Sequence, residues 1–302
     1  QRRGGRGVQG ASSREEDLVE HRVVANTHSY ILFFTDKGKC YWVKVYDIPE
    51  GGRAAKGRAI VNLIGCEPDE KVSAFISVKE FNDDHFVVMA TEKGIVKKTK
   101  LSAYSNPRKK GIYAVEIRDG DKLIEARVST GDNDILLGTR NGKSIRFSEE
   151  QIRPSGRKTM GVKGITLSSE DDRLVGMLLI KREGTTVLVA TEKGFGKRTE
   201  ISQYRAQKRG GKGVLTMKTT DKVGKMVTIK EVVDKDDLMI ITNQGVLIRQ
   251  PVSQIRAIGR ATQGVKLIKL GEGTLVSSIT RIMSEEDSGD ENNSTEPKGN
   301  TE

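Results

Sequence analysis

The chain repeats a short motif about every 51 residues, and this period restricts its fold more than any other feature. A repeat of this length is typical of solenoids and propellers, in which each unit buries its apolar face against the next one. Degenerate copies of the motif begin at Arg58 and Pro107, which makes six copies in all. The four clear copies of R-x-x-x-G-V lie at Arg3–Val8, Arg157–Val162, Arg209–Val214 and Arg260–Val265.

Two further motifs recur between these copies. An apolar run followed by T-x-x-G is typical of a β-hairpin, because glycine accepts the positive φ that such a turn needs. An apolar third segment follows each copy of R-x-x-x-G-V, as in EEDLVEHRV and DDRLVGMLLI, so each period predicts about four short strands. The T-x-x-G runs end at Gly38, Gly94, Gly142, Gly194 and Gly245. Basic residues lie in the second strands of most of these hairpins, at Lys97-Lys98, Arg146, Lys197-Arg198 and Arg249.

Four short strands repeated around an axis are typical of a propeller-like ring of blades, which leaves only short protected strand edges. The Trp-Asp pairs of WD40 blades are missing, and the single tryptophan, Trp42, does not fit the kelch pattern. There are six R-x-x-x-G-V segments and six apolar third segments, but only five T-x-x-G hairpins. We therefore predict an all-β, six-bladed ring with about four strands per blade, whose first blade is truncated at the N-terminus.

Positive charge dominates the chain, but it is not spread evenly. Lys and Arg number 52 against 41 Asp and Glu, which gives a net charge of +11. Residues 284–302 carry −6 and no apolar side chain, which leaves +17 on residues 1–283. We predict one folded domain over 1–283 and a disordered acidic tail over 284–302. The tail either competes with a polyanion for the basic surface or only aids solubility.

Simple counts exclude several classes of protein. No run approaches the roughly 18 apolar residues of a membrane span, and no secretory signal opens the chain. Two cysteines, Cys40 and Cys66, cannot build a disulfide framework, so we expect a reduced, cytoplasmic protein. The start at Gln1 suggests a fragment of a longer chain.

The segment around each R-x-x-x-G-V motif, called the box loop below, carries basic residues at one phase of the repeat. If every blade places its box loop at the same edge, these residues form a belt suited to the phosphates of duplex DNA, and the adjacent glycines let the backbone approach closely. No aromatic residue lies among them, which argues against stacking on single strands. Solvated turns, or a scaffold for an acidic protein or RNA, are the alternatives. The predicted rim residues are Lys56, Arg58, Arg108, Lys109, Lys110, Arg153, Arg157, Lys158, Lys208, Arg209, Lys212, Arg256 and Arg260.

No sequence pattern in the chain predicts a catalytic site, a phosphate-binding P-loop or a metal site. GTRNGKS at Gly138–Ser144 is one residue short of a phosphate-binding P-loop and falls in a predicted hairpin. The histidines His21, His28 and His85 lack metal-ligand spacing. We therefore predict no catalytic residue, no metal and no cofactor in this chain.

The first seven residues, QRRGGRG, resemble the box heptapeptide that defines the C-terminal domain of the DNA gyrase A subunit. TEKGFGKRT and AIGRATQGV resemble later repeats of that domain, so the resemblance covers about residues 1–283. It implies a six-bladed β-pinwheel that bends and wraps duplex DNA with right-handed sense. It also assigns the box role to Gln1, Arg2, Arg3, Gly4, Gly5, Arg6 and Gly7.

QKRGGKG at Gln207–Gly213 is a second, near-identical box, so which copy dominates wrapping is left open. The resemblance implies three partners in the bacterial cytoplasm: duplex DNA, the gyrase B subunit, and the rest of the gyrase A subunit. The cleaving tyrosine, ATP and Mg²⁺ would belong to other domains or subunits, and the whole enzyme would introduce negative supercoils. The equivalent domain of topoisomerase IV, which usually lacks the heptapeptide, is the alternative. The isolated fragment is expected to be monomeric.

Overall fold

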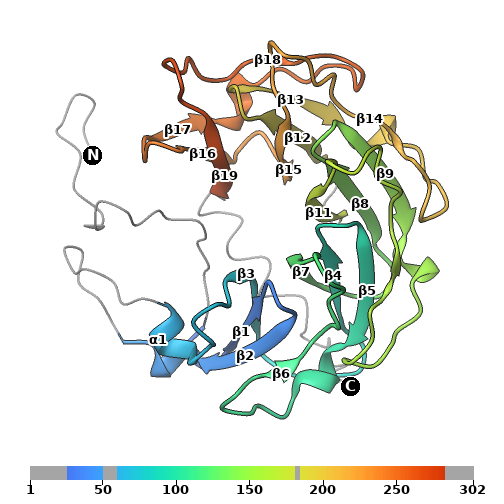
Figure 1. The fold of residues 1–302 in the computed structure, drawn as a ribbon, viewed down its shortest axis with the longest axis vertical. Helices are drawn as coiled ribbons and strands as arrows, with labels where there is room; N and C mark the ends of the chain where they lie inside the picture. The colour runs from blue at the N-terminus through green and yellow to red at the C-terminus, as the bar shows by residue number, and fades with distance from the viewer. Residues whose placement is uncertain (1–25, 50–59, 181–183, 283–302) are drawn as a thin grey trace, which may run out of the picture.

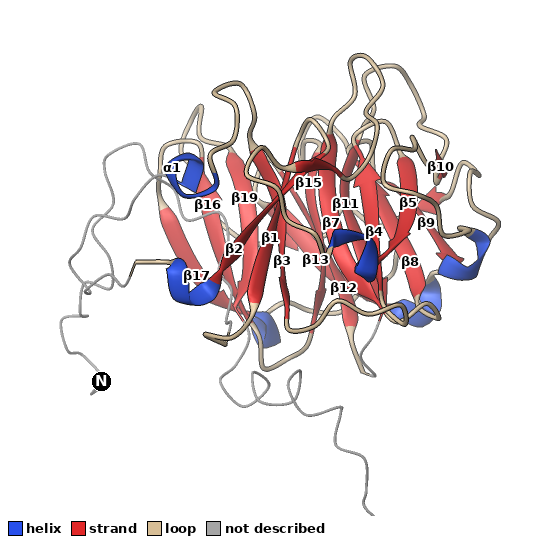
Figure 2. Cartoon of the chain, turned by 90° about the horizontal axis from the view of Figure 1, so that it is seen from below, coloured by secondary structure: helices blue, strands red, loops and turns tan. Residues whose placement is uncertain are grey.

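The computed structural model describes residues 26–49, 60–180 and 184–282. In this part, five β-sheets follow one another around an open arc, from the first sheet at the bottom of Figure 1 to the last at its upper left. We call them the first to fifth blades in chain order. Seen from the side, the strands run through the thickness of the ring, from one face toward the other (Figure 2).

Each blade is built on a hairpin whose turn is a T-x-x-G motif. Gly142 has φ 81°, and a Cβ there would collide with the carbonyl of Met217, so only glycine fits. The threonine hydroxyl closes the turn, as where Thr91 Oγ1 accepts the amide of Ile95 at 3.2 Å. The five hairpins are β1 (Tyr30–Thr35) and β2 (Lys39–Lys44), β4 (Phe86–Thr91) and β5 (Ile95–Lys100), β8 (Asp134–Thr139) and β9 (Lys143–Ser148), β12 (Thr186–Thr191) and β13 (Phe195–Glu200), and β16 (Asp237–Thr242) and β17 (Leu247–Pro251).

The apolar third segments form inner strands, each antiparallel to the first strand of its own hairpin. These strands lie nearest the centre of the ring and pack against one another in chain order (Figure 1). They are β3 (Val72–Val78), β7 (Leu123–Ser129), β11 (Leu174–Ile180), β15 (Met226–Val232) and β19 (Val276–Ile282). Short 3-10 helices follow the hairpins: η1 (Val45–Asp47), η2 (Leu101–Tyr104), η3 (Glu149–Gln151), η4 (Ile201–Gln203) and η5 (Val252–Gln254).

The box loops end in short outer strands that pair with the preceding blade, not with their own. β6 follows the hairpin of the second blade, yet it pairs with β2 of the first. In the same way β10 pairs with β5, β14 with β9 and β18 with β13. After its 3-10 helix, the chain therefore crosses to the preceding blade, forms the outer strand there, and returns to form the inner strand of its own blade. The outer strands are β6 (Ile112–Tyr113), β10 (Val162–Lys163), β14 (Val214–Leu215) and β18 (Val265–Lys266).

The prediction of six blades is wrong, because the described residues form five blades of three or four strands. The number of blades equals the number of hairpins. A hairpin supplies the two middle strands of a four-stranded blade, and each outer or inner strand pairs only with a hairpin strand. The degenerate box copy that begins at Arg58 continues into a short helix, α1 (Ile60–Ile64). The segment EEDLVEHRV, which we placed in a truncated first blade, lies outside the described residues.

The apolar cores lie between successive blades. Leu32 and Phe34 of the first blade pack with Val87 and Met89 of the second, and all four side chains are buried. Three similar cores join the later blades of the described residues. Full burial of such side chains is worth about 1.5–3 kcal/mol each, so much of the stability comes from contacts between blades. A further cluster, which includes Ile64 of α1, covers the other face of the first blade.

A polar contact accompanies each of these cores. The fourth residue of the second hairpin strand donates a hydrogen bond to a backbone carbonyl in or just after the 3-10 helix of the next blade. A hydrogen bond to a buried carbonyl removes the cost of leaving that group without a partner. The four contacts are Trp42 Nε1 to Tyr104 O at 2.8 Å, Lys98 Nζ to Glu149 O at 3.4 Å, Arg146 Nη1 to Tyr204 O at 3.2 Å and Arg198 Nε to Ile255 O at 2.7 Å.

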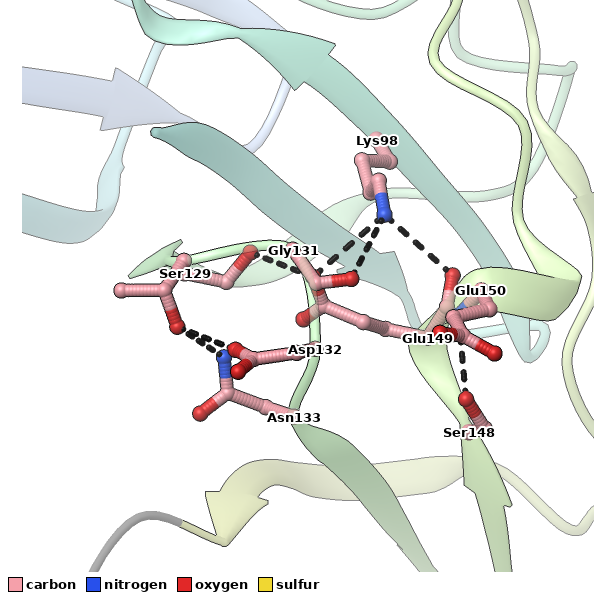
Figure 3. A network of polar contacts seen from close by, with 9 residues as sticks. Lys98, Ser129, Gly131, Asp132, Asn133, Ser148, Glu149 and Glu150 are labelled. Carbon is pink, nitrogen blue, oxygen red and sulfur yellow. Dashed lines mark hydrogen bonds and ion pairs between the residues drawn. The ribbon is translucent and has the colours of Figure 1, made fainter. Parts of the chain in front are cut away.

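The contact made by Lys98 includes a carboxylate of the next blade (Figure 3). Its ammonium group lies 3.3 Å from Glu149 Oε1, and both side chains are buried. The same carboxylate oxygen accepts a hydrogen bond of 2.9 Å from Ser129 Oγ, and the carbonyl of Gly131 lies 3.5 Å from Lys98 Nζ. Lys98 therefore joins the second blade to the third by a buried ion pair and does not belong to the exposed positive charge.

We expect Arg198→Met to lower the free energy of unfolding by about 1–3 kcal/mol, because it leaves the buried carbonyl of Ile255 without its donor. The matched control is Arg249→Met, at the same position of the fifth blade. The Arg249 side chain is 64% exposed, against 9% for Arg198, and it pairs with Asp237 of its own hairpin. The control should stay within about 0.5 kcal/mol of the unchanged protein in urea unfolding. Equal losses in both variants would contradict a stabilising contact between blades.

Candidate nucleic-acid interface

The box loops lie at the outer edge of the ring, between a 3-10 helix and the outer strand of the preceding blade (Figure 1). Their common shape has a steric cause at the glycine that precedes the outer strand. In the third-blade loop this is Gly161, with φ 86°, and a Cβ there would lie 2.5 Å from the carbonyl oxygen of Val96. This glycine is therefore required for the loop to rest on β5.

Successive box loops are hydrogen-bonded to one another around the edge of the ring. In each contact, a backbone amide that follows one outer strand donates to a carbonyl of the next box loop. The loops therefore form one connected surface, which we call the rim. The contacts are Glu116 N to Thr159 O at 3.1 Å, Thr166 N to Gly211 O at 2.9 Å and Lys218 N to Thr262 O at 3.0 Å.

Most of the predicted basic residues in the described box loops point to solvent. A chain of exposed cations along one connected surface favours a polyanion that follows the rim. Three basic residues of the rim escaped the sequence analysis, Lys163, Arg205 and Lys266, and all three are exposed. Lys163 and Lys266 each follow the G-V of a box motif directly, so the signal was present in the repeat. The exposed predicted residues are Arg108, Lys109, Lys110, Arg153, Lys158, Lys208, Lys212 and Arg256.

The arginine that opens the box motif is only half exposed and has a structural role. Arg209 donates from Nε to the carbonyl of Gln151 at 3.0 Å and from Nη1 to that of Lys163 at 3.1 Å. Arg260 repeats the second contact one blade later, with Nη1 at 2.6 Å from the carbonyl of Leu215. These two guanidinium groups tie each box loop to the preceding one. Arg157 is half-buried as well.

Two lysines lie beneath the rim and are almost completely buried, Lys97 at 1% and Lys197 at 0% exposure. Lys97 Nζ donates to the carbonyl of Ala114 at 2.7 Å and to that of Arg157. Burial lowers the pKa of Lys97 to about 7, and the Arg157 guanidinium acts in the same direction, while Glu116 opposes both.

The other buried lysine holds the box loop of the fifth blade. Lys197 Nζ donates to the carbonyls of Gly259, at 2.7 Å, and Arg260, and to Thr262 Oγ1 at 3.0 Å. Burial and then the charge of Arg260 lower the pKa of Lys197 to about 8. The paired basic residues of β5 and β13 are therefore buried supports: Lys97 and Lys197 hold box loops, and Lys98 and Arg198 make contacts between blades.

Several predicted site residues lie outside the described residues: Gln1, Arg2, Arg3, Gly4, Gly5, Arg6, Gly7, Lys56 and Arg58. GTRNGKS forms the turn between β8 and β9 rather than a strand-to-helix turn. Within the described ranges, no group of three His, Cys, Asp or Glu side chains is placed to hold a metal ion. No helix in the same part of the chain is long and apolar enough to cross a membrane.

The buried lysines make stability depend on pH in a defined direction. A lysine with a pKa near 7 in the folded state and about 10.4 when unfolded binds fewer protons in the folded chain across this range. The free energy of unfolding should therefore rise with pH from about 7.5 to about 9, by at most about 1.4 kcal/mol per pH unit for Lys97. Lys97→Met should remove this part of the slope in urea unfolding at the two pH values. The exposed Lys100→Met is the control, and a Lys97→Met slope equal to its slope would contradict the shift.

A family model for the DNA gyrase C-terminal domain, a beta-propeller, matches five segments of the chain: residues 29–79, 85–130, 133–181, 185–232 and 236–282. Each segment holds one hairpin with its inner strand, so the model divides the chain into the same five blades.

Curated relatives and solved structures give a consistent result. The chain is 46% identical over 289 residues to the DNA gyrase A subunit of Staphylococcus epidermidis strain ATCC 12228, covering 95% of this chain and 32% of the relative. It is 45% identical over 303 residues to that of Staphylococcus aureus strain NCTC 8325, covering 100% and 34%. The chain thus spans about a third of these relatives.

The fold itself is similar to two solved structures. The C-terminal domain of DNA topoisomerase IV matches with a TM-score of 0.79 and 25% identity, over 85% of this chain and 80% of that one. A DNA gyrase A C-terminal domain matches in fold with a TM-score of 0.74 and 22% identity, over 92% and 93%. Since the family model matches all five blades, the chain belongs to the DNA gyrase C-terminal domain family.

Proposed function

We propose that this domain binds duplex DNA along the rim, without sequence specificity, and bends and wraps it. The observation that carries the proposal is the series of exposed lysines and arginines along box loops that are hydrogen-bonded to one another. Cations spaced along a curved surface attract successive phosphates, and a duplex that follows them must bend. The bend costs on the order of several kcal/mol, which the added phosphate contacts offset.

The elements that read base sequence are not found in the described part of the chain. Its longest helix, α1, has five residues, too few for a recognition helix in the major groove. Phosphate contacts position DNA but carry no sequence information. The domain should therefore select DNA by flexibility rather than by base identity.

We expect duplexes of equal length and shuffled sequence to bind with affinities that differ by less than about tenfold, with flexible sequences ahead of stiff ones. Competition between labelled and unlabelled duplexes measures this directly. A discrimination of several hundred-fold that follows individual bases would contradict binding through the backbone.

The whole proteins to which this chain is similar are named as A subunits of DNA gyrase, and the function of the longer assembly is carried over as part of the proposal. We infer that the domain acts in the bacterial cytoplasm with a gyrase B subunit, and with the rest of a gyrase A subunit. There it would support ATP-dependent negative supercoiling, with the cleaving tyrosine, ATP and Mg²⁺ held by other parts of the enzyme. Gln1–Gly7 and Gln207–Gly213 are the proposed anchors of the wrapped duplex, and residues 284–302 a proposed competitor of DNA.

The test is to replace Arg108, Lys109 and Lys110 by Ala together, because these three exposed cations share one box loop. Loss of about three phosphate contacts should reduce the slope of log K against log salt concentration by about 2–3. Anisotropy of a labelled duplex at several salt concentrations measures the slope. Ligation of relaxed circles in the presence of the domain measures wrapping, which should fall with it.

The matched control removes three exposed lysines that lie outside the box loops, in the segments leading into the inner strands β3, β7 and β15: Lys71, Lys122 and Lys222. It changes the net charge equally but leaves the rim intact. If the control lowered the salt slope as much as the box-loop variant, binding would reflect net charge alone, and the proposed path along the rim would be wrong.

A further inference from the structure

One position of every four-stranded blade lies directly beneath a box loop. It is the third residue of the second hairpin strand, next to the residues that pair with the outer strand. An ideal Cβ at Gly111 would lie 2.8 Å from Tyr41, and one at Gly161 would lie 3.1 Å from Lys97 Cβ, so these loops rest on the side chains. The four residues at this position are Tyr41, Lys97, Ile145 and Lys197.

The fold does not require a charge at this position. In the first blade Tyr41 fills it and donates a hydrogen bond of 2.9 Å to Glu70. In the third blade Ile145 fills it with an apolar side chain that is 0% exposed. Only the second and fourth blades bury an ammonium group here, so Lys97 and Lys197 need an explanation other than packing.

Both ammonium groups are held by neutral acceptors. In the described residues their partners are the backbone carbonyls of Ala114, Arg157, Gly259 and Arg260 and the hydroxyl of Thr262, and neither makes an ion pair with a carboxylate. A buried cation without a counter-ion is costly. The charged groups that act on them are Arg157 and Glu116 at Lys97, and Arg260 at Lys197.

The surface above Lys97 is open to an anion. A hollow of about 680 Å³ lies between β5 and the box loop of the third blade, and Lys97, Arg153 and Arg209 are among its lining residues. The hollow is also lined by one carboxylate, that of Glu150, and a phosphate near it would face the three basic side chains as well. Its negative charge would favour the protonated form of a lysine beneath it.

We propose that Lys97 and Lys197 are positioning residues for duplex DNA: their buried amino groups hold the backbone of two box loops, and each takes up a proton from solvent when DNA phosphates lie above it. The inference rests on the proposed function, since it needs DNA on the rim.

Linkage makes the proposal measurable, because proton uptake on binding requires that affinity fall as pH rises. With pKa values of about 7 and about 8, the two free lysines together lack about one proton at pH 7.5, about three quarters of it at Lys97. Binding of a duplex should therefore take up about one proton at pH 7.5, and full uptake would lower the affinity by about 25-fold between pH 7.5 and 8.5.

The experiment is calorimetric titration of the full chain with a duplex of roughly 40 base pairs at pH 7.5, in two buffers that differ in ionisation enthalpy. The number of protons taken up follows from the difference in observed heat. Lys97→Met should lose about three quarters of the uptake and Lys197→Met about one quarter. Lys100→Met, which removes an exposed charge from the end of β5, should keep all of it.

The outcomes separate the inference from the proposed function. Binding of the unchanged chain without proton uptake would overturn the role of the lysines and leave DNA binding intact. Uptake that persists in both methionine variants would overturn it as well, because other groups would then be the source. Absence of duplex binding would overturn the proposed function, and the lysine role with it. The unchanged chain alone decides the first and third outcomes, whether or not the variants fold.

Discussion

The pairing of each outer strand with the preceding blade is the contact on which the rest of this ring depends. It completes the sheet of one blade with residues that follow the hairpin of the next, so neighbouring blades are joined by continuous backbone as well as by side chains. It also carries the box loops of the second to fifth blades across the outer edge of a junction. The position of the exposed cations on the rim is therefore a consequence of how the sheets are completed.

The junctions use polar groups in two different ways. Trp42, Lys98, Arg146 and Arg198 satisfy buried carbonyls of the next blade, so they stabilise the ring itself. Lys97 and Lys197, the residues just before two of them, face the box loops and hold loop carbonyls instead. Adjacent residues of a strand point to opposite faces of the sheet, which explains why neighbouring lysines have such different partners.

The same division appears within the box motif. Its first arginine ties one loop to another, as Arg209 and Arg260 do, and its glycine permits contact with the strand below, as at Gly161. The residues around them, such as Lys158 and Lys212, remain exposed. The motif recurs because it builds a loop of one shape. The basic side chains around it vary from loop to loop and give the surface its charge. A polyanion bound there would meet a frame that is already hydrogen-bonded, which lowers the entropy lost on binding.

The sequence by itself determined the features that arise from short stretches of chain. A turn such as Thr139–Gly142 needs only its own threonine and glycine, so the five hairpins could be predicted. The position of the basic residues within each repeat could be predicted as well, because they recur around the R-x-x-x-G-V motif.

Only the tertiary structure decided which blade each strand joins, how many blades there are, and which basic residues are buried. Val162 pairs with Val96, far away in the chain, and no local pattern specifies such a partner. Lys97 and Lys158 look alike in the sequence, yet one is buried beneath a loop and the other is exposed on it. Burial depends on the packing of distant segments, whereas turns depend on the conformational preferences of a few consecutive residues.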